Sequence, residues 1–360
     1  MRAVVMRNKK LITDDLPTPE PGEGEVLVKT LACGICGTDL HAFKHAEKFV
    51  ERARRVGSPH ETDLSRDIVM GHEFCSEIVD YGPSTTRNLK LGTRVCGIPR
   101  LVRPDRIHAV GFSCETPGGF AEYMPLTESL LFEVPEDLSS EQAALTEPMA
   151  VGRHAVEKAQ LDRNDVALVI GCGPIGLAVV AALRLKGVRP IIAVDFSRRR
   201  RGFAEALGAD VVVDPAEHSP YETWSEVAAW DNPEDAPPSH PLFPGPTHRP
   251  AVIFECVGIP GVIEQVMASA PRDARIVALG LCMERDQFEP AFGVLKELVL
   301  QFVIGYSLEE FGDTLRGIAD GKIPVEPLIT GKVGLEGVAD AFEELYSPEK
   351  HAKIVVEPVR

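Results

Sequence analysis

The sequence predicts an α/β protein with two domains, an irregular antiparallel barrel-like domain and a doubly wound parallel sheet. Residues 1–150 contain short strand-like runs separated by Pro- and Gly-containing turns, as antiparallel sheets do. From residue 166 onward, near-continuous apolar runs alternate with helical stretches, which indicates a parallel sheet covered on both faces. A length of 360 residues also suits about two domains.

The first domain is expected to hold short strands and one helix. The helix is expected over Ala46–Val56, where the charge pattern is helical. The expected strands are Ala3–Val5, Glu25–Leu31, Ile78–Tyr81, Arg94–Gly97 and Phe120–Pro125. The tail, Leu308–Arg360, returns to mixed short elements. We therefore expect one domain over 1–150, completed by 305–360, and the other over 151–304.

The second domain is expected to contain six apolar strands, from VALVIG at Val166 to the run Leu300–Gly305. The uncharged stretch 166–183 contains three glycines and a proline, so a strand, a tight loop and a buried helix explain it better than a membrane span. Residues 215–250 interrupt the alternation, and Asn232–Pro250 is dense in proline, which can neither continue a helix nor donate to a sheet. A long surface loop is expected there.

Composition narrows the possible functions. The net charge of −16 disfavours binding to nucleic acid, because an acidic chain repels phosphate backbones. The N-terminal sequence lacks a long apolar region and a cleavage site, so a cytoplasmic protein that does not bind membranes is expected. In a chain of this length without a secretion signal, the eight cysteines are expected to be free thiols or metal ligands.

A glycine-rich turn predicts a dinucleotide site. The sequence GCGPIG follows the run VALVI, precedes a helical stretch, and is followed 19 residues later by an acidic residue at the end of the next strand. The glycines allow a tight turn and close approach of a pyrophosphate, and the helix N-terminus attracts the anion. The candidate residues are Gly171, Gly173, Pro174, Ile175, Gly176 and Asp195. Asp195 favours NAD because it repels a 2′-phosphate, although the arginines at 198–201 can accommodate one.

Residues typical of a zinc site lie close together early in the chain. Residues 33–41 read CGICGTDLH and residues 71–73 read GHE. Catalytic zinc is held by three protein ligands drawn from Cys, His and carboxylate, with one position open. The same residues are also compatible with a Cys-x-x-Cys redox pair and a structural histidine.

These motifs, in this order, resemble the zinc-containing medium-chain alcohol dehydrogenase family over essentially the whole chain. The early segment PxPGEGEVLVK, PGGFAEY near residue 118 and TEPMAVGRHA near residue 147 extend the match. An acidic residue in the third ligand position resembles the polyol, secondary-alcohol and threonine dehydrogenase branches. The resemblance implies a GroES-like catalytic domain over 1–150 with 305–360, and a Rossmann NAD-binding domain over 151–304.

The resemblance also assigns roles to single residues. The implied catalytic residues are Cys36, Thr38, His41, His72, Glu73 and Glu147. Zinc is expected on Cys36, His72 and Glu147, with Glu73 as the alternative acidic ligand, while Thr38 and His41 relay the proton. Arg200 is expected to contact the adenosine ribose. Cys33 is interpreted as a small buried thiol.

One catalytic zinc per chain is expected, without a structural zinc, because the stretch where relatives carry four cysteines offers only Cys96 and Cys114. The expected reaction is hydride transfer between NAD and an alcohol, with a secondary alcohol or polyol as the substrate class. The alternatives are a zinc-free quinone or enoyl reductase and a non-catalytic nucleotide-binding protein. Relatives are dimers or tetramers, so a homodimer or homotetramer is expected. The segment Ala46–Val56 is hypothesised to cover the mouth of the substrate site.

Overall fold

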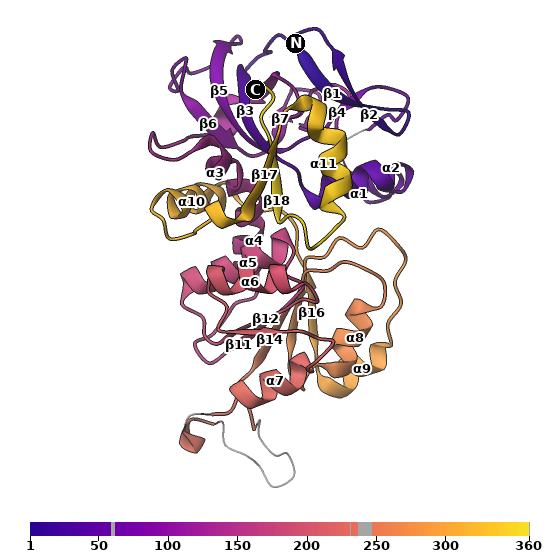
Figure 1. Ribbon diagram of the computed structural model, residues 1–360, viewed down its shortest axis with the longest axis vertical. Helices are drawn as coiled ribbons and strands as arrows, with labels where there is room; N and C mark the ends of the chain where they lie inside the picture. Colours follow the sequence, from indigo (N-terminus) through magenta and orange to yellow (C-terminus); the bar gives the residue numbers. More distant parts are fainter. Residues whose placement is uncertain (59–61, 231, 237–246, 360) are drawn as a thin grey trace. The chain divides into compact units, whose positions relative to one another are not determined.

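The computed structural model describes residues 1–58, 62–230, 232–236 and 247–359. The chain divides into two compact units, Met1–Pro148 with Ser307–Arg360, and Met149–Tyr306. Both chain ends therefore lie in the first unit, where Figure 1 marks them. The sequence predicted boundaries at 150/151 and 304/305, and the observed boundaries, after Pro148 and after Tyr306, each lie two residues away.

The first unit is built on a mostly antiparallel sheet of seven strands in the order β10-β6-β5-β3-β18-β17, with β9 also paired to β3. Only β17 and β18 run parallel to each other among the pairs described. The strands are β3 (Glu25–Gly34), β5 (Glu73–Tyr81), β6 (Arg94–Gly97), β9 (Tyr123–Thr127), β10 (Leu131–Glu133), β17 (Ile329–Val333) and β18 (Lys353–Val356).

Smaller elements complete this unit. A second sheet has the order β2-β1-β4, and β7 forms a hairpin with β8. These strands are β1 (Arg2–Arg7), β2 (Lys10–Asp15), β4 (Ile68–Val69), β7 (Arg100–Val102) and β8 (Ile107–Ala109). The helices are α1 (Gly37–Lys44), α2 (Ala46–Arg55), α3 (Ser140–Ala144), α10 (Leu308–Ala319) and α11 (Val338–Leu345), with 3-10 turns η1 (Glu128–Leu130), η3 (Glu326–Leu328) and η4 (Leu335–Gly337). The helix expected at Ala46–Val56 is confirmed as α2.

The core of the first unit lies between the sheets and α11. Phe120 and Phe342 are buried and meet edge to face, with ring centroids 6.1 Å apart. Phe43 of α1 meets the same Phe342 ring edge to face at 5.7 Å. The tail residues are thus part of the N-terminal domain's core, which fixes α1 and the adjoining end of β3.

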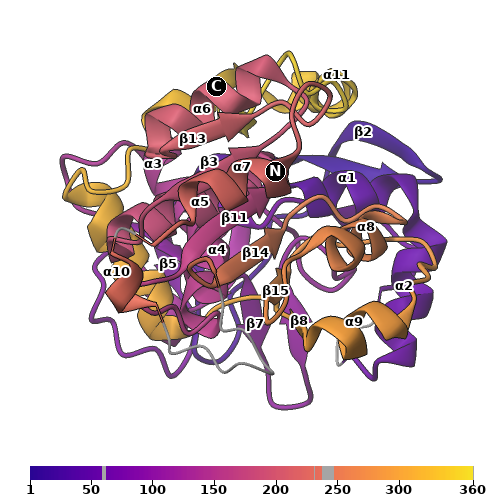
Figure 2. The ribbon, with the colours of Figure 1, turned by 90° about the horizontal axis from the view of Figure 1, so that it is seen from below.

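The second unit is a six-stranded, all-parallel sheet in the order β13-β12-β11-β14-β15-β16. The strands are β11 (Val166–Ile170), β12 (Ile191–Val194), β13 (Val211–Val213), β14 (Ala251–Glu255), β15 (Arg275–Ala278) and β16 (Val299–Phe302). In Figure 2, β11, β14 and β15 lie side by side in that order. The strand order reverses between β11 and β14, which makes the carboxyl ends of these strands the expected ligand-binding edge.

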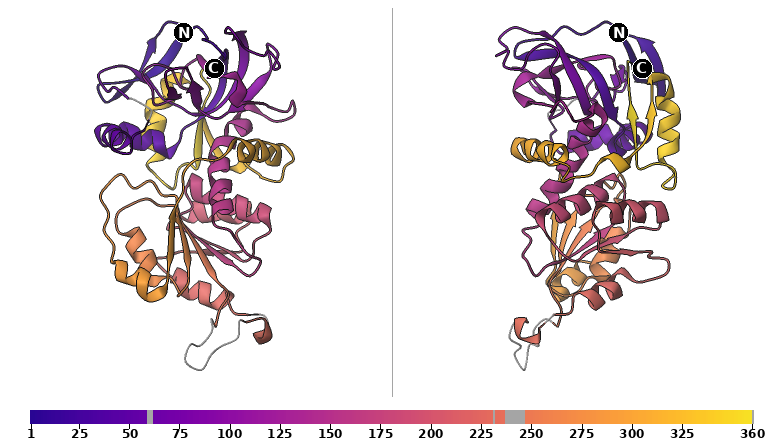
Figure 3. Two further views of the ribbon diagram at one scale, coloured as in Figure 1. Left: turned by 180° about the vertical axis from the view of Figure 1, so that it is seen from behind. Right: turned by 60° about the vertical axis from the view of Figure 1, so that its left-hand side comes forward.

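Helices cover both faces of the parallel sheet. In Figure 3, α5 and α6 lie on one face, with α8 and α9 on the other. The helices of this unit are α4 (Thr146–Lys158, which begins in the first unit), α5 (Pro174–Lys186), α6 (Arg198–Leu207), α7 (Pro220–Val227), α8 (Val262–Ser269) and α9 (Pro290–Lys296), with a 3-10 turn η2 (Pro233–Asp235). The doubly wound sheet predicted from the alternating sequence is confirmed, as is the strand, turn and helix over 166–183. No helix in the described part of the chain is long and apolar enough to cross a membrane.

The expectation of a continuous loop over 215–250 is wrong in its first part. Residues 220–227 form α7, and the hydroxyl of its N-cap, Ser219, accepts from the amide of Glu222. Pro220 occupies the first helical turn, where a missing N–H costs nothing. Trp224 is buried in the core of the unit, so tertiary packing stabilises a helix whose sequence signal is weak. Residues 237–246 lie outside the described residues.

Candidate metal and dinucleotide sites

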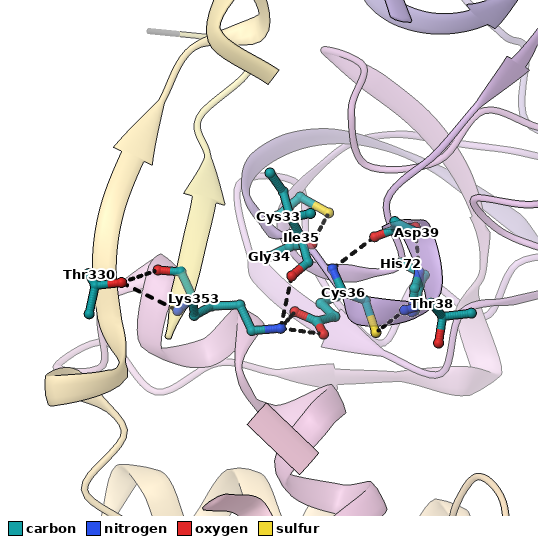
Figure 4. A network of polar contacts seen from close by, with 10 residues as sticks. Cys33, Gly34, Ile35, Cys36, Thr38, Asp39, His72, Thr330 and Lys353 are labelled. Atoms are coloured by element: carbon teal, nitrogen blue, oxygen red, sulfur yellow. Dashed lines mark hydrogen bonds and ion pairs between the residues drawn. The ribbon is translucent and has the colours of Figure 1, made fainter. Parts of the chain in front are cut away.

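The first candidate site forms where β3 ends and α1 begins. Cys36 is the N-cap of α1, and its sulfur accepts from the amide of Thr38 at 3.4 Å. The carboxylate of Asp39 accepts from the amide of Cys36 at 2.9 Å, which completes a capping box. The cap fixes the position of the Cys36 sulfur, and Figure 4 shows Asp39 reaching back toward this turn.

His72 meets Cys36 at this turn. The chain reaches it just before β5, whose first residue, Glu73, lies opposite Gly34 of β3. Nδ1 of His72 is 3.2 Å from Oδ1 of Asp39, and the ring hydrogen-bonds the Cys36 side chain. Burial opposes protonation of His72, but Asp39 and Cys36 outweigh it and raise its pKa well above the ordinary value. A carboxylate on one ring nitrogen is how metal-binding histidines are held, so Cys36 and His72 fit a zinc site.

A buried ion pair between Glu73 and Lys353 lies next to Cys36 and His72. Nζ of Lys353 is 2.7 Å from both carboxylate oxygens of Glu73 and donates to the carbonyl of Ile35 at 3.1 Å. Neither side chain of the pair is more than 3% exposed. Thr330 donates to the carbonyl of Lys353 at 3.1 Å and so ties β17 to the start of β18, as Figure 4 shows. Burial opposes the charge on Lys353, but Glu73, Cys36 and Glu147 together raise its pKa, so the lysine is cationic.

The predicted acidic ligand comes from the start of another helix. Glu147 is the second residue of α4 and lies near enough to Lys353 for its charge to raise the lysine pKa. Among the described residues, no three His, Cys, Asp or Glu side chains converge as a complete set of metal ligands. The structure therefore brings Cys36 and His72 together, while zinc binding by Glu147 and by its alternative, Glu73, stays a prediction.

The expected proton-relay residues both lie on α1. Thr38 and His41 are three positions apart, so their side chains share one face of the helix. Burial, with contributions from His45 and Lys44, lowers the pKa of His41 below its ordinary value. His41 is therefore poised as a neutral imidazole near neutral pH.

Three other cysteines of this unit, Cys33, Cys96 and Cys114, lie on different elements. Cys33 is fully buried, and its sulfur sits against Gly119, where an added Cβ would come within 2.6 Å of it. Cys96 is fully buried in β6, whereas Cys114 is partly exposed in the loop after β8. The chain between Cys96 and Cys114 is held by contacts that involve no cysteine, including the 2.8 Å hydrogen bond from Arg103 to the buried carboxylate of Glu25.

The second candidate site is the glycine-rich turn of the parallel sheet. Gly171 follows β11 with φ of +92°, and an added Cβ on Gly176 would lie 1.8 Å from the carbonyl oxygen of Gly171. Gly173 is the N-cap of α5 and Pro174 its first residue, with Ile175 next. The turn therefore presents the N-terminus of α5 at the carboxyl edge of the sheet, which is suited to a pyrophosphate.

Asp195 is held beside this turn. Its two carboxylate oxygens accept from the amides of Cys172 and Ser197, each at 2.8 Å. Nη1 of Arg200 is 3.8 Å from the nearer oxygen, while Arg201 instead pairs with Asp214. Asp195 and Arg200 thus lie side by side, and their binding of the adenosine ribose stays a prediction.

Sequence reasoning did not single out Asp39 or Lys353. The spacing Cys-x-x-Asp before a helix was a capping-box signal that could have indicated Asp39. Lys353 opens the otherwise apolar strand KIVV, and a charge in such a strand indicates a buried partner. Nothing in the sequence identifies that partner as Glu73.

Two family models match this chain. The model described as the alcohol dehydrogenase GroES-like domain matches residues 22–136, and that of the zinc-binding dehydrogenases matches residues 174–320. Together they cover most of both units. The chain belongs to the zinc-binding medium-chain dehydrogenases.

The similar proteins include butanediol and sorbitol dehydrogenases, which form the polyol branch of the family. The chain is 32% identical to (R,R)-butanediol dehydrogenase of Bacillus subtilis (strain 168), covering 99% of this chain and 100% of that protein. The crystal structure of 2R,3R-butanediol dehydrogenase from Bacillus subtilis matches with a TM-score of 0.79 at 29% identity, covering 99% of each chain. Sorbitol dehydrogenase of Bos taurus is 28% identical, covering 92% of this chain and 88% of that one. A protein of Sinorhizobium meliloti 1021 described as a zinc-binding dehydrogenase and bound to NADP has a TM-score of 0.79 at 26% identity, covering 99% of each chain.

Proposed function

We propose that this chain is a zinc-dependent, NAD-linked dehydrogenase of secondary alcohols or polyols that forms the corresponding ketone or aldehyde. The observation that carries the proposal is the Cys36–His72 contact, with Asp39 behind the imidazole. The names of the butanediol and sorbitol dehydrogenases support the substrate class.

Cys36, His72 and Glu147 would hold one catalytic zinc per chain. Bound zinc supplies Lewis acidity, which lowers the pKa of an alcohol so that an alkoxide can form near neutral pH. Oδ1 of Asp39 lies 3.2 Å from Nδ1 of His72 and would orient the ring, which leaves the other ring nitrogen for the metal. Lys353 occupies both oxygens of Glu73, which favours Glu147 over Glu73 as the acidic ligand.

The alcohol proton would leave along α1. The Thr38 hydroxyl would accept this proton as it releases its own, and His41 would pass a proton on to solvent. A neutral His41 can accept a proton at neutral pH, which agrees with the lowering of its pKa by burial.

The cofactor would bind at the turn from Gly171 to Gly176. The carboxylate of Asp195 disfavours the 2′-phosphate of NADP, and this supports NAD. Arg200 lies 3.8 Å from that carboxylate, and its positive charge partly offsets the preference for NAD over NADP. The selectivity is therefore expected to be modest, and the NADP bound to the Sinorhizobium protein is consistent with that.

Helix α2 would help shape the substrate site. Phe49 of α2 stacks on Phe112 with ring centroids 5.4 Å apart, and Phe112 lies 5.0 Å from the ring of His72. This aromatic chain links α2 to a proposed zinc ligand. Phe49→Ala is expected to change the ranking of substrates more than it changes zinc content.

A homo-oligomer is proposed as the assembly. β16 is an edge strand of the parallel sheet, and its neighbourhood exposes large apolar side chains. They are Val294, Leu295, Val299, Phe302 and Ile304.

The decisive experiment is a substrate screen on protein whose zinc content has been measured. Butane-2,3-diol, sorbitol, primary alcohols and ketones would be compared with NAD and NADP. The proposal predicts about one zinc per chain, turnover of secondary alcohols or polyols, and faster turnover with NAD. Zinc-loaded protein that oxidises none of these alcohols and reduces none of the ketones would refute it.

A further inference from the structure

Two cysteines outside the proposed site, Cys75 of β5 and Cys96 of β6, are the next residues after the paired stretch of these neighbouring strands. The register pairs Ser76 with Val95 and Glu77 with Arg94. The paired stretch ends there, and continuing the same antiparallel register by one step would set Cys75 opposite Cys96. Both side chains are fully buried, and directly opposed residues of antiparallel strands point to the same face of the sheet.

The backbone hydrogen bonds define the type of this pair. The carbonyl of Arg94 accepts from Val134, and the amide of Ile98 donates to Leu130, so even-numbered residues of β6 direct their backbone groups toward β10. The carbonyl of Thr93 instead accepts from Ile78 of β5. In the continued register, Cys75 and Cys96 would therefore form a pair without backbone hydrogen bonds between them. Non-hydrogen-bonded pairs have Cα atoms about 4.5 Å apart, and disulfides span about 4.4–6.8 Å.

The surroundings of the two thiols connect them to the turn that carries Glu147. Ser140, the first residue of α3, borders Cys75, while Thr146, the first residue of α4, borders Cys96. Burial, and secondarily the neighbouring Cys75 thiol, raise the pKa of Cys96 well above its ordinary value, which agrees with two thiols lying close together in an apolar setting. Glu147 directly follows Thr146.

We propose that Cys75 and Cys96 are a redox modification site, at which oxidation forms a disulfide that locks β5 to β6 beneath the α3–α4 turn. With a peroxide as oxidant, one thiol is oxidised to a sulfenic acid and one water is released. The second thiol displaces the hydroxyl as a second water, and the S–S bond forms. Two thiols and one peroxide thus give one disulfide and two waters, and a dithiol reductant reverses the step.

The other neighbouring pair of thiols provides an internal comparison. Burial is the main cause that raises the pKa of Cys256, and the Cys172 thiol also contributes to it. The sulfur of Cys172, however, lies 3.5 Å from the carbonyl of Val194 on β12, while Cys256 follows β14 on the opposite side of β11. We therefore expect a linkage between residues 75 and 96 and none between 172 and 256.

Peptide mapping of the zinc-loaded protein tests the site directly. The protein would be treated with hydrogen peroxide, alkylated after denaturation, and digested without reduction. A peptide joining Cys75 to Cys96 is expected in the wild type and in Cys282→Ser, a control at a partly exposed thiol. It is expected to be absent after reduction, and in Cys75→Ala and Cys96→Ala. Recovery of both residues as alkylated thiols, or in other linkages, would overturn the proposal, and this result needs no active enzyme.

A second measurement tests the link to Glu147, and it rests on the proposed function. Peroxide is expected to lower the alcohol-oxidation rate of the wild type at least twofold more than that of Cys75→Ala, and dithiothreitol is expected to restore the difference. Equal losses in both proteins, with the 75–96 peptide present, would refute the link to the catalytic site. A reduced wild type without activity would refute the proposed function, and the peptide map would still decide on the disulfide.

Discussion

The two candidate sites are built from different parts of the chain. The candidate zinc site depends on side chains from distant segments, since Cys36, His72 and the neighbouring Lys353 come from three separate parts of the sequence and meet at one end of β3. The dinucleotide site depends on the backbone of six consecutive residues, where the absence of a side chain matters most. Side-chain chemistry therefore decides the first site, and backbone conformation decides the second.

The largest effect is expected from removing a proposed zinc ligand. Cys36→Ala should lose bound zinc and about 4 kcal/mol of transition-state stabilisation, roughly a thousandfold in kcat/KM, because Lewis acidity is lost. Metal analysis and steady-state kinetics would measure both. Cys33→Ala is the matched control, since Cys33 lies three residues away and is also buried, and it should keep its zinc.

Two glycine substitutions should separate fold from cofactor binding at the second site. Gly176→Ala places a Cβ 1.8 Å from the carbonyl oxygen of Gly171, and such overpacking costs about 3 kcal/mol or more of unfolding free energy. Gly173→Ala meets nothing within 4 Å, so its stability should be unchanged while its Kd for NADH rises at least about tenfold, or 1.4 kcal/mol. Denaturant titration and NADH fluorescence would distinguish the two. Normal NADH binding by Gly173→Ala would contradict the assigned pyrophosphate position.

Breaking the buried ion pair should destabilise the first unit. Lys353→Met leaves the carboxylate of Glu73 buried without its partner, which costs about 3–5 kcal/mol. The double variant with Glu73→Gln should recover part of that loss in urea unfolding. Arg7→Ala, which breaks the partly exposed pairs with Asp14 and Asp67, should cost only about 1 kcal/mol or less. Equal losses of unfolding free energy in Lys353→Met and Arg7→Ala would show that the buried Glu73–Lys353 pair contributes no more to stability than partly exposed pairs.

The smallest effect is expected from the proton relay. Because the pKa of His41 is lowered, the imidazole should stay neutral, and able to accept a proton, somewhat below its ordinary pKa. The rate of alcohol oxidation should therefore stay constant as the pH is lowered past about 6.5, and it should fall only at still lower pH. His41→Gln should slow turnover about tenfold and remove this limb from the pH–rate profile, and added imidazole should restore part of the rate. An unchanged profile would remove His41 from the relay.

The fold was predictable to the extent that local patterns determine it. The alternation of apolar strands and helices defined the parallel sheet and the turn at Gly171, because both are local features. The sequence did not reveal α7, since burial of Trp224 stabilises that helix within a proline-rich stretch. It also could not pair Lys353 with Glu73, because such a contact depends on which strands become neighbours in space. The candidate zinc-binding residue types could be recognised in the sequence, whereas the residues that orient them could be identified only in the structure.

The placement of β18 has a consequence for how the protein is made. Val355 and Val356 pair with Gly34 and Cys33, so one of the last strands to be synthesised lies beside residues from the first tenth of the chain. During synthesis, the turn at Cys36 leaves the ribosome long before its strand partner, with the whole parallel-sheet unit translated in between. That unit can fold on its own local contacts, whereas the GroES-like domain must wait for its tail. The newly made chain should therefore retain zinc only late in synthesis.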